Sequence, residues 1–429
     1  MDDRVTLRLS EPMAEMYSAV ANLLIVNIAR HLDEGDAKES REWQMKKLSE
    51  LGALTEESVG IIAAVTGTKK DVIRRTFGEA LNLTASEVDA LCRSAGLPPL
   101  PEISASPSMA QVLEMFSAQA ERDTNLVNTV MLESTRQRYL MAVDHIVSAW
   151  EKSYIEYLTE TESYESLDKK LEAAQKIMNI GAGQAVTGAF SYTEAVRDAV
   201  KRLARDGITG FIDIGGHEWS PEAYVFMDIR TTIHNTALKA QQTRAEEYGV
   251  YTFQISTKAA ARPLCAPYQG VICSWNRGDR GQVTDLNGNV HDYISIYDTS
   301  YGEAAGIFGI NCGHFPETFI SGYSVPRYEK LSQSELEKNT REYEITQGQR
   351  KLERDVRDAK TYAKALQAAG DTEGYEKQMK VVRAKRAEYA QYCSNNKVEE
   401  RTDKLTVAGF GRSSAAKTVE TIIRGNGGN

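Results

Sequence analysis

Two glycine-containing segments hold most of the side chains that could do chemistry in this chain. Residues 261–270 have the sequence ARPLCAPYQG, and residues 309–316 have the sequence GINCGHFP. Thiolate and imidazole groups suit zinc, so the candidate metal ligands are Cys265, Cys273, Cys312 and His314. The spacings Cys-x7-Cys and Cys-x-His are not those of the common zinc knuckles. The sequence therefore predicts no bound metal and no other cofactor, with a metal site as an alternative.

A cysteine nucleophile is the second kind of chemistry that these segments could support. Cys265 or Cys312 would need His314 or His234 within hydrogen-bond reach as a base, and a third group to orient the imidazole. The sequence does not single out such a third group, and it contains no P-loop, dinucleotide-binding glycine motif, HExxH or GxSxG motif. We predict no catalytic residues and no enzymatic activity. Small buried thiols and a hydrogen-bonded histidine in a structural module are the favoured interpretation.

Two helical segments carry further polar side chains that invite a functional interpretation. In the helix that Ser220-Pro221 is predicted to start, Arg230, His234 and Ala237 are spaced by four and three, so they share one face. We expect this face to hold a neighbouring strand module by hydrogen bonds. Residues 55–78 have the outline of a helix-turn-helix whose second helix carries Lys69, Lys70, Arg74 and Arg75. DNA binding by this segment is an alternative, but two packed helices with a basic face are far commoner.

The elements that must position these residues predict an α+β fold that is predominantly helical. Helical periodicity covers residues 10–94 in short units divided by glycines, and a capping-box spacing at residues 84–87 predicts a helix start. Prolines at 98, 99 and 101 predict a domain boundary, and Ser106-Pro107 predicts the next helix, which continues with breaks to about residue 178. Alternating apolar residues from Tyr251 predict short strands, and a final pair of apolar stripes predicts an antiparallel helical hairpin.

These signals divide the chain into five consecutive regions. They are a helical N-terminal domain (1–97), a helical middle region (106–184), an α+β core module (185–326), a helical hairpin (327–398) and a loose C-terminal tail (399–429).

Charge and cysteine content limit the classes of protein that remain. The net charge is −9, but residues 351–429 have 16 Lys+Arg against 11 Asp+Glu, which leaves 35 against 49 for the rest (51 − 16 and 60 − 11). Nonspecific contact with DNA is therefore expected only from the basic C-terminal region. Five scattered cysteines and an acidic N-terminus indicate reduced thiols and a cytosolic protein, and the apolar stretch at residues 21–29 is too short to span a membrane.

Several ordered blocks of the sequence resemble the phage minor capsid protein 2 family, which is more distantly similar to the head-morphogenesis proteins named after phage Mu. The blocks include EWQ at residues 42–44, YTEAVR at 192–197, MDIRTT at 227–232, the two segments around Cys265 and Cys312, and QRKLER at 349–354. The chain departs from the family form at residues 256–258, where a histidine is expected beside the serine. The family-motif residues are Arg230, His234, Arg262, Pro263, Cys265, Gln269, Gly270, Asn311, Cys312 and His314.

This resemblance implies a structural protein of a tailed phage or prophage head, present at low copy number and acting in head morphogenesis. Its implied partners are the portal protein, the major capsid protein or both. Its implied place is the head interior or portal vertex of the virion, and the host cytoplasm during assembly. The resemblance leaves open whether the protein enters the host with the DNA. The two alternatives from the residues themselves are a metal-binding or cysteine-dependent enzyme module carried by a prophage, and a helix-turn-helix DNA-binding protein.

Overall fold

The computed structural model describes residues 3–32, 40–160, 192–212, 216, 218–368 and 371–407. They form a predominantly helical α+β fold, as the sequence predicts. The α-helices are α1 (Asp3–His31), α2 (Ser40–Thr66), α3 (Lys69–Ser94), α4 (Pro107–Glu160), α6 (Tyr192–Asp206), α7 (Pro221–Glu247), α8 (Gln333–Ala368) and α9 (Thr372–Asn396). The strands are β1 (Phe211–Ile212), β2 (Glu218–Trp219), β3 (Thr252–Ile255), β4 (Ile272–Ser274), β5 (Gly281–Thr284), β6 (Val290–Ser295) and β7 (Pro316–Thr318).

Two compact units divide the chain, and each is assembled from three separate segments. Unit 1 comprises residues 1–14, 68–126 and 223–350, and unit 2 comprises residues 15–67, 127–222 and 351–429. The sequence instead suggests consecutive domains. Helices α1, α4 and α8 supply residues to both units, and local periodicity does not reveal which partners each part of a long helix packs against.

Unit 1 contains a helical core that joins α3, α4 and α7. Leu81 and Ala85 of α3 pack with Met109 of α4 and Ala240 of α7. These apolar positions place α7 with one side against helices, which leaves another side for the sheet.

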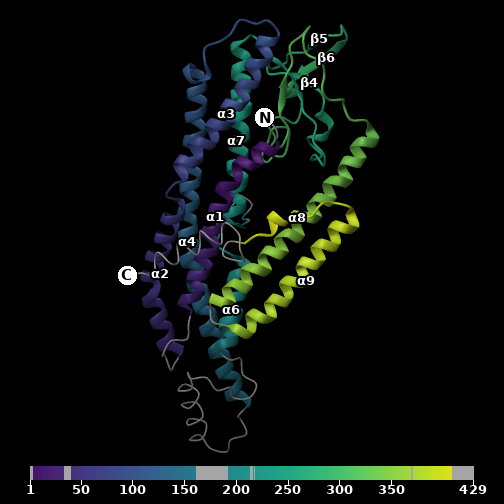
Figure 1. The fold of residues 1–429 in the computed structure, drawn as a ribbon. Coiled ribbons are helices and arrows are strands. Elements are labelled where there is room, and N and C mark those ends of the chain that lie inside the picture. The colour runs from purple at the N-terminus through teal and green to yellow at the C-terminus, as the bar shows by residue number, and fades with distance from the viewer. Residues whose placement is uncertain are drawn as a thin grey trace, which may run out of the picture. The chain divides into compact units, whose positions relative to one another are not determined.

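The sheet of unit 1 is mixed, with the strand order β5-β6-β4-β3-β7. Figure 1 labels the strands β4, β5 and β6 of this sheet. All neighbouring strands are antiparallel except β4 and β6, which are parallel. Its core is a cluster in which Leu238 of α7 packs with Phe253, Trp275 and Phe308. The Phe253 and Trp275 rings are stacked with their centroids 4.1 Å apart. This cluster also contains three cysteines, so the sheet and α7 together determine where the thiols lie.

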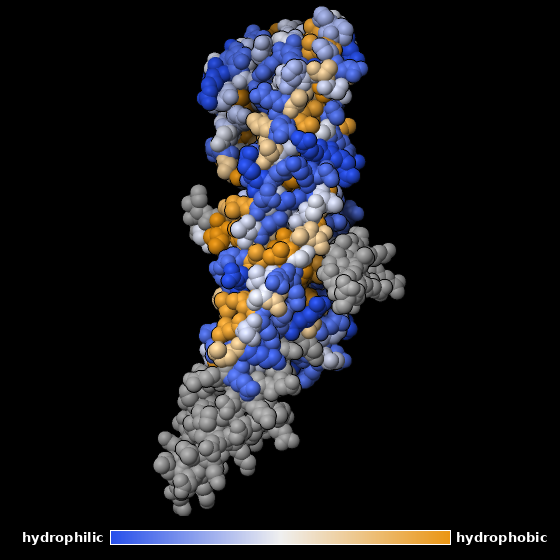
Figure 2. Space-filling view, turned by 90° about the vertical axis from the view of Figure 1, so that its left-hand side faces the viewer, coloured by the Kyte–Doolittle hydropathy of each residue, from blue (hydrophilic) through white to orange (hydrophobic). Residues whose placement is uncertain are grey.

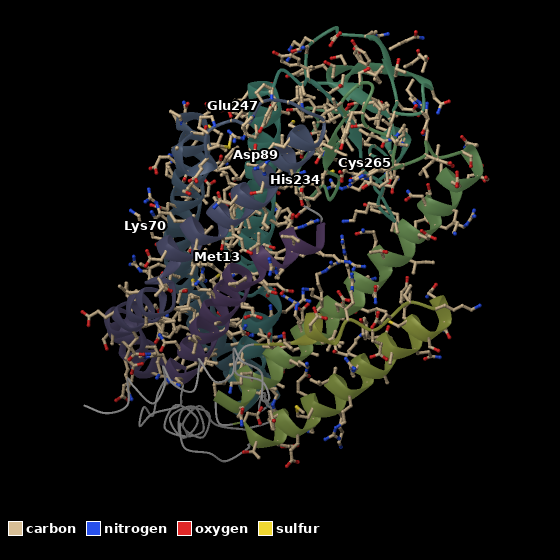
Figure 3. All side chains as sticks on the ribbon, turned by 45° about the horizontal axis from the view of Figure 1, so that its top comes forward. Met13, Lys70, Asp89, His234, Glu247 and Cys265 are labelled. Carbon is tan, nitrogen blue, oxygen red and sulfur yellow. The ribbon has the colours of Figure 1, made fainter. Side chains whose placement is uncertain are left out.

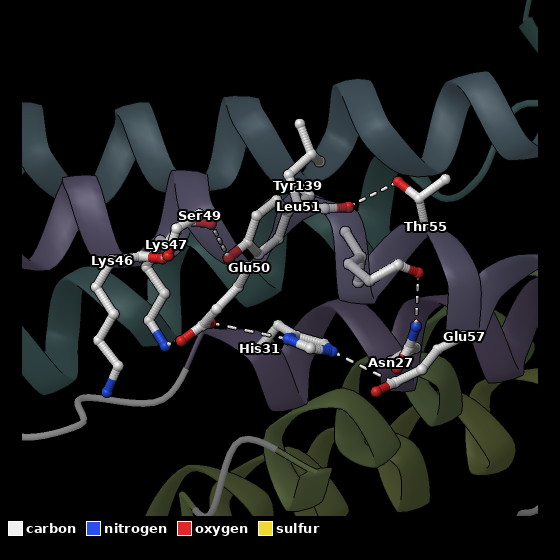
Figure 4. A network of polar contacts seen from close by, with 11 residues as sticks. Asn27, His31, Lys46, Lys47, Ser49, Glu50, Leu51, Thr55, Glu57 and Tyr139 are labelled. Atoms are coloured by element: carbon white, nitrogen blue, oxygen red, sulfur yellow. Dashed lines mark hydrogen bonds and ion pairs between the residues drawn. The ribbon is translucent and has the colours of Figure 1, made fainter.

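Unit 2 contains a polar network that ties α1, α2 and α4 together (Figure 4). His31 lies 3.3 Å from the carboxylate of Glu57 and 3.8 Å from that of Glu50. The fully buried Lys47 donates to Glu50 at 3.2 Å, and its backbone carbonyl accepts a hydrogen bond from the Tyr139 hydroxyl at 2.9 Å. Buried polar groups need such partners, so the network specifies how these three helices pair.

Helix α1 is apolar enough to be considered as a membrane span. Among the described residues one helical segment, Arg4–His31, has the length and composition to cross a bilayer, with a mean hydropathy of 1.2 over its most apolar window. Of that window, 72% is buried within the protein, which is also the pattern of a core helix.

The predicted C-terminal hairpin forms, and in unit 2 it joins the second half of α8, from residue 351, to α9. Ala363 of α8 packs against Val382 of α9, with Met379 beside them. Asp371 caps α9 by accepting a hydrogen bond from the Gly374 amide at 2.8 Å. Arg386 of α9 pairs with Glu400 at 2.9 Å.

Several predicted helix boundaries in the first half of the chain are wrong. Gly52 and Gly78 lie inside α2 and α3, and the predicted helix start at residues 84–87 lies inside α3, where the Thr84 hydroxyl donates to the Ala80 carbonyl. Helix α4 is one unbroken helix of 54 residues as far as it is described. Tertiary packing overrides these weak local signals. The start at Ser106-Pro107 is confirmed, because the Ser106 hydroxyl accepts from the Met109 amide.

Two other predictions fall on parts of the chain outside the described residues. They are the end of the second helical region at about residue 178 and the loose tail beyond residue 407.

Candidate functional site

The two chemistry-bearing segments meet because β3 and β7 are neighbouring antiparallel strands. Ile255, at the end of β3, is opposite Pro316, at the start of β7. Pairing continues one step further, since the Ser256 amide donates to the Phe315 carbonyl at 2.9 Å and the Ser256 hydroxyl accepts from the Phe315 amide at 2.8 Å. The chain leaving β3 and the chain entering β7 therefore lie at the same end of the sheet. This brings residues 261–270 next to residues 309–315.

Cys265, Cys312 and His314 form a buried cluster at this meeting point. The two Sγ atoms and one imidazole nitrogen all lie within 4.8 Å of one another, and Cys312 Sγ is 3.3 Å from His314 Nδ1. The three residues are only 1%, 3% and 2% exposed. The hydrogen bond between the thiols holds the pKa of Cys312 well below its usual value, helped by His314, and it raises the pKa of Cys265 together with burial.

Helix α7 supports the loop that carries Cys312. Arg230 donates through Nη1 to the backbone carbonyl of Asn311 at 3.1 Å and to its side-chain oxygen at 3.2 Å. The Asn311 amide donates to the Thr231 hydroxyl at 3.1 Å, and Asn311 has a left-handed backbone with φ of 56°. His234 is 1% exposed and packs its ring edge against Phe315 at 4.5 Å between centroids. Figure 3 shows His234 on α7 and Cys265 among the loops beside the sheet.

The remaining family-motif residues support the loop that carries Cys265. Arg262 donates to the Ile310 carbonyl, and Gln269, which is buried, accepts a hydrogen bond from the Lys258 amide. Pro263 is exposed. Gly270 has φ of 77°, and a β-carbon there would lie 2.6 Å from the carbonyl oxygen of Glu329, so this position requires glycine. Arg262 and Gln269 therefore hydrogen-bond to backbone groups, and Gly270 allows the chain to pass close to Glu329, so these residues fix the conformation of the loop.

Cys273 does not belong to the buried cluster, although it was one of the four candidate ligands. It lies in the middle of β4 opposite Ile294 and is fully buried. Burial raises its pKa to about 12, so this thiol stays protonated at neutral pH.

Sequence analysis missed two buried polar residues that hold the same loops. Gln254 of β3 donates to the carbonyls of Gly270 and Tyr328 at 2.9 and 2.8 Å. Asn339 of α8 accepts from the Ala261 amide and donates to the Ala261 carbonyl, both at 2.7 Å. For Gln254, the only hint in the sequence was its position between the apolar residues Phe253 and Ile255. The alternating pattern of a strand predicted that this glutamine would face solvent.

A hollow with a volume of about 270 Å³ lies near the cluster but does not contain it. Residues of the 301–310 loop line it, with Thr231 and Asn235 of α7. Neither cysteine of the cluster nor His314 is among its lining residues. The arrangement therefore offers ligand chemistry without an open route for a substrate from this hollow.

Three of the four basic residues of the possible helix-turn-helix contact α4, and the fourth, Arg75, is exposed. Lys69 donates to Asn125 at 2.5 Å, and Arg74 donates to Glu114 at 2.6 Å. Lys70 lies 3.7 Å from a carboxylate oxygen of Glu121. These contacts engage three of the four basic side chains, although Lys70 and Arg74 are still 66% and 55% exposed.

Comparison with known proteins agrees with the resemblance in the sequence. The model of the family described as phage minor capsid protein 2 matches residues 1–166 and 167–394. The chain belongs to the phage minor capsid protein 2 family. A structural protein of Lactococcus phage LL-H is 27% identical over 378 residues, which cover 87% of this chain and 90% of that protein. A structural protein of Lactococcus phage mv4 is 38% identical over 80 residues, 19% of this chain and 63% of that protein.

No solved structure matches this member of the phage minor capsid protein 2 family. Membership identifies the chain as a structural protein of a bacteriophage.

Proposed function

We propose that this protein is a low-copy component of the phage head, located at the portal vertex or the head interior, and that it acts in head morphogenesis. The observation that carries the proposal is the family match across 394 residues, together with a phage structural protein that aligns over 90% of its own length. A relation that covers nearly the whole of both chains supports a shared overall role.

Exposed apolar side chains on α2 support contact with another virion protein. Met45, Leu48 and Val59 are 63%, 40% and 48% exposed, and their spacings of three and eleven place them on one face of the helix. Figure 2 shows apolar patches interspersed among the hydrophilic surface. Apolar side chains that share one exposed helix face offer a surface that a partner protein could bury. The portal protein and the major capsid protein are the partners we propose.

The basic C-terminal region is the part that we propose contacts packaged DNA. Lys380 and Arg383 are exposed on α9. Reversing both charges should weaken the binding of duplex DNA at low salt, whereas the paired control, Arg75→Glu with Lys201→Glu, changes exposed bases elsewhere and should not. Equal loss in both double variants would argue against a C-terminal DNA contact. Because a protein bound to packaged DNA could leave the head with it, we also propose that the protein is delivered with the DNA.

We propose further that the protein acts without catalytic turnover. The one cysteine–histidine pair within the described cluster is 97–98% buried, and the nearby hollow does not contain it. A small thiol-reactive probe should therefore label Cys312 slowly in the native protein and rapidly after unfolding. Fast labelling of Cys312 in the native state would favour a cysteine-dependent enzyme.

The central test is quantitative mass spectrometry of purified particles of the phage or prophage that encodes the chain. Recovery in far fewer copies than the major capsid protein is the expected result. Portal-enriched fractions should retain the protein if it lies at the portal vertex. Complete absence from mature particles would overturn the proposal and favour an assembly factor that leaves before maturation.

A further inference from the structure

We propose that Cys265, Cys312 and His314 form a binding site for a divalent metal ion of the zinc class, with two sulfur donors and one imidazole nitrogen. This inference does not depend on the role of the protein in the phage head. It concerns three of the four side chains that the sequence nominated and excludes the fourth, Cys273.

The separations between the donor atoms fit one shared ion. Bonds of about 2.3 Å to sulfur and about 2.1 Å to nitrogen in tetrahedral geometry hold the donor atoms roughly 3.5 to 3.8 Å apart. Cys312 Sγ and His314 Nδ1 are 3.3 Å apart, and no pair in the cluster exceeds 4.8 Å. An ion would therefore require the donor-atom separations to change by at most about 1 Å.

The charges of the three ligands also fit a divalent ion. Two thiolates carry a charge of −2 and the imidazole is neutral, so a site occupied by a divalent ion would have no net charge. Neutrality matters because the residues are at most 3% exposed, and an uncompensated charge is costly at such a place. Metal binding to thiols and imidazole displaces their protons to solvent, so zinc uptake should release protons.

The loops that present the ligands are held in place by bonds outside the cluster. Arg230 and Thr231 of α7 fix Asn311, immediately before Cys312. On the other loop, the Cys265 amide donates to the Arg262 carbonyl at 2.9 Å. Orientation of ligands by surrounding hydrogen bonds is a regular feature of metal sites, because it lowers the cost of assembling them.

The deep burial of the donors favours a structural ion over a catalytic one. The ion would join the loop after β3 to the loop before β7 and would leave a fourth position for a further ligand. His234 of α7 packs its ring against Phe315, the residue after His314, so α7 borders the same place. We expect the ion to stabilise unit 1, with the affinity falling as the pH drops and protons compete for the thiolates.

The decisive experiment is metal titration of the reduced, full-length chain. Elemental analysis after purification without chelators should find one zinc ion per chain. Cobalt(II) added to the chelator-treated protein should produce intense thiolate-to-metal charge-transfer bands and the visible bands of a tetrahedral site, and zinc should bleach them. Absence of zinc together with no cobalt spectrum in the folded protein would overturn the proposal.

Variants assign the ligands. Cys265→Ser combined with Cys312→Ser should abolish the cobalt charge-transfer bands, and His314→Ala should weaken zinc binding at least tenfold. Cys273→Ser is the matched control, since it changes a fully buried thiol of the same core that lies outside the cluster, and it should keep one ion. If a ligand variant fails to fold, the wild-type cobalt spectrum still decides, because it reports thiolate ligation directly. Loss of the ion in Cys273→Ser but not in the double variant Cys265→Ser with Cys312→Ser would refute the assignment.

Discussion

Replacement of Arg244 by methionine should destabilise unit 1 more than any loss of an exposed ion pair. The Arg244 side chain is fully buried on α7. It donates to both carboxylate oxygens of Asp89 at 2.6 and 2.9 Å, to Glu247 at 2.8 Å and to the Pro101 carbonyl at 2.7 Å. Figure 3 shows Asp89 and Glu247 in this region. Methionine fills a similar volume and provides none of these donors.

The expected loss follows from what remains after the substitution. Asp89 and Glu247 are only 15% and 25% exposed, so their charges would stay largely buried without a cation. Breaking a buried pair from one side costs about 3–5 kcal/mol. Unit 1 has 201 residues (14 + 59 + 128), and at about 2–4 °C per kcal/mol its unfolding midpoint should fall by roughly 6 to 20 °C.

Thermal unfolding followed by circular dichroism, with Arg74→Met as the control, tests this reasoning. Arg74 lies 2.6 Å from Glu114, a distance as short as any in the Arg244 network, but the two side chains are 55% and 67% exposed. Exposed pairs contribute about 0–1 kcal/mol, so the control should change the midpoint little. Adding Asp89→Asn to Arg244→Met should recover part of the loss by removing a stranded charge. Equal shifts for Arg244→Met and Arg74→Met would show that burial does not set the cost.

Three further substitutions have distinct expected outcomes. Burial raises the pKa of Asp228 to about 7, which makes its ionised form unfavourable in the folded state, so Asp228→Asn should raise the unfolding midpoint more at pH 8 than at pH 5; equal gains would contradict this. The Arg197 guanidinium holds the pKa of Asp371 below its usual value. The stabilisation by this ion pair is therefore present above about pH 4 and is lost as the pH falls through the folded-state pKa of Asp371. In denaturant unfolding, Asp371→Asn should cost about 2 kcal/mol at pH 7 and less at pH 3. Gly270→Ala should cost well over 1 kcal/mol, whereas Gly288→Ala, with φ of 84° and open space, should cost only about 1 kcal/mol; similar urea midpoints would refute the predicted clash.

The residues of the candidate site could be nominated from the sequence, but their grouping could not. Cysteine and histidine are recognisable as metal ligands by residue type alone, so Cys265, Cys273, Cys312 and His314 were all candidates from the sequence. Cys265 and Cys312 are 47 positions apart (312 − 265), and only the antiparallel pairing of β3 with β7 brings them together. The same sheet places Cys273 in β4 and keeps it out of the group.

The amino-acid sequence by itself determined the family, the helical α+β class, and the elements with strong local signals, such as the helix start at Ser106-Pro107 and the α8–α9 hairpin. It did not determine helix lengths, because glycines and a capping pattern inside long helices are outweighed by packing along their whole length. Nor did it determine the two interleaved units or the buried pair between Arg244 and Asp89, 155 positions apart. Local propensity acts over a few residues, whereas burial depends on which distant segments meet, and only the tertiary structure decides that.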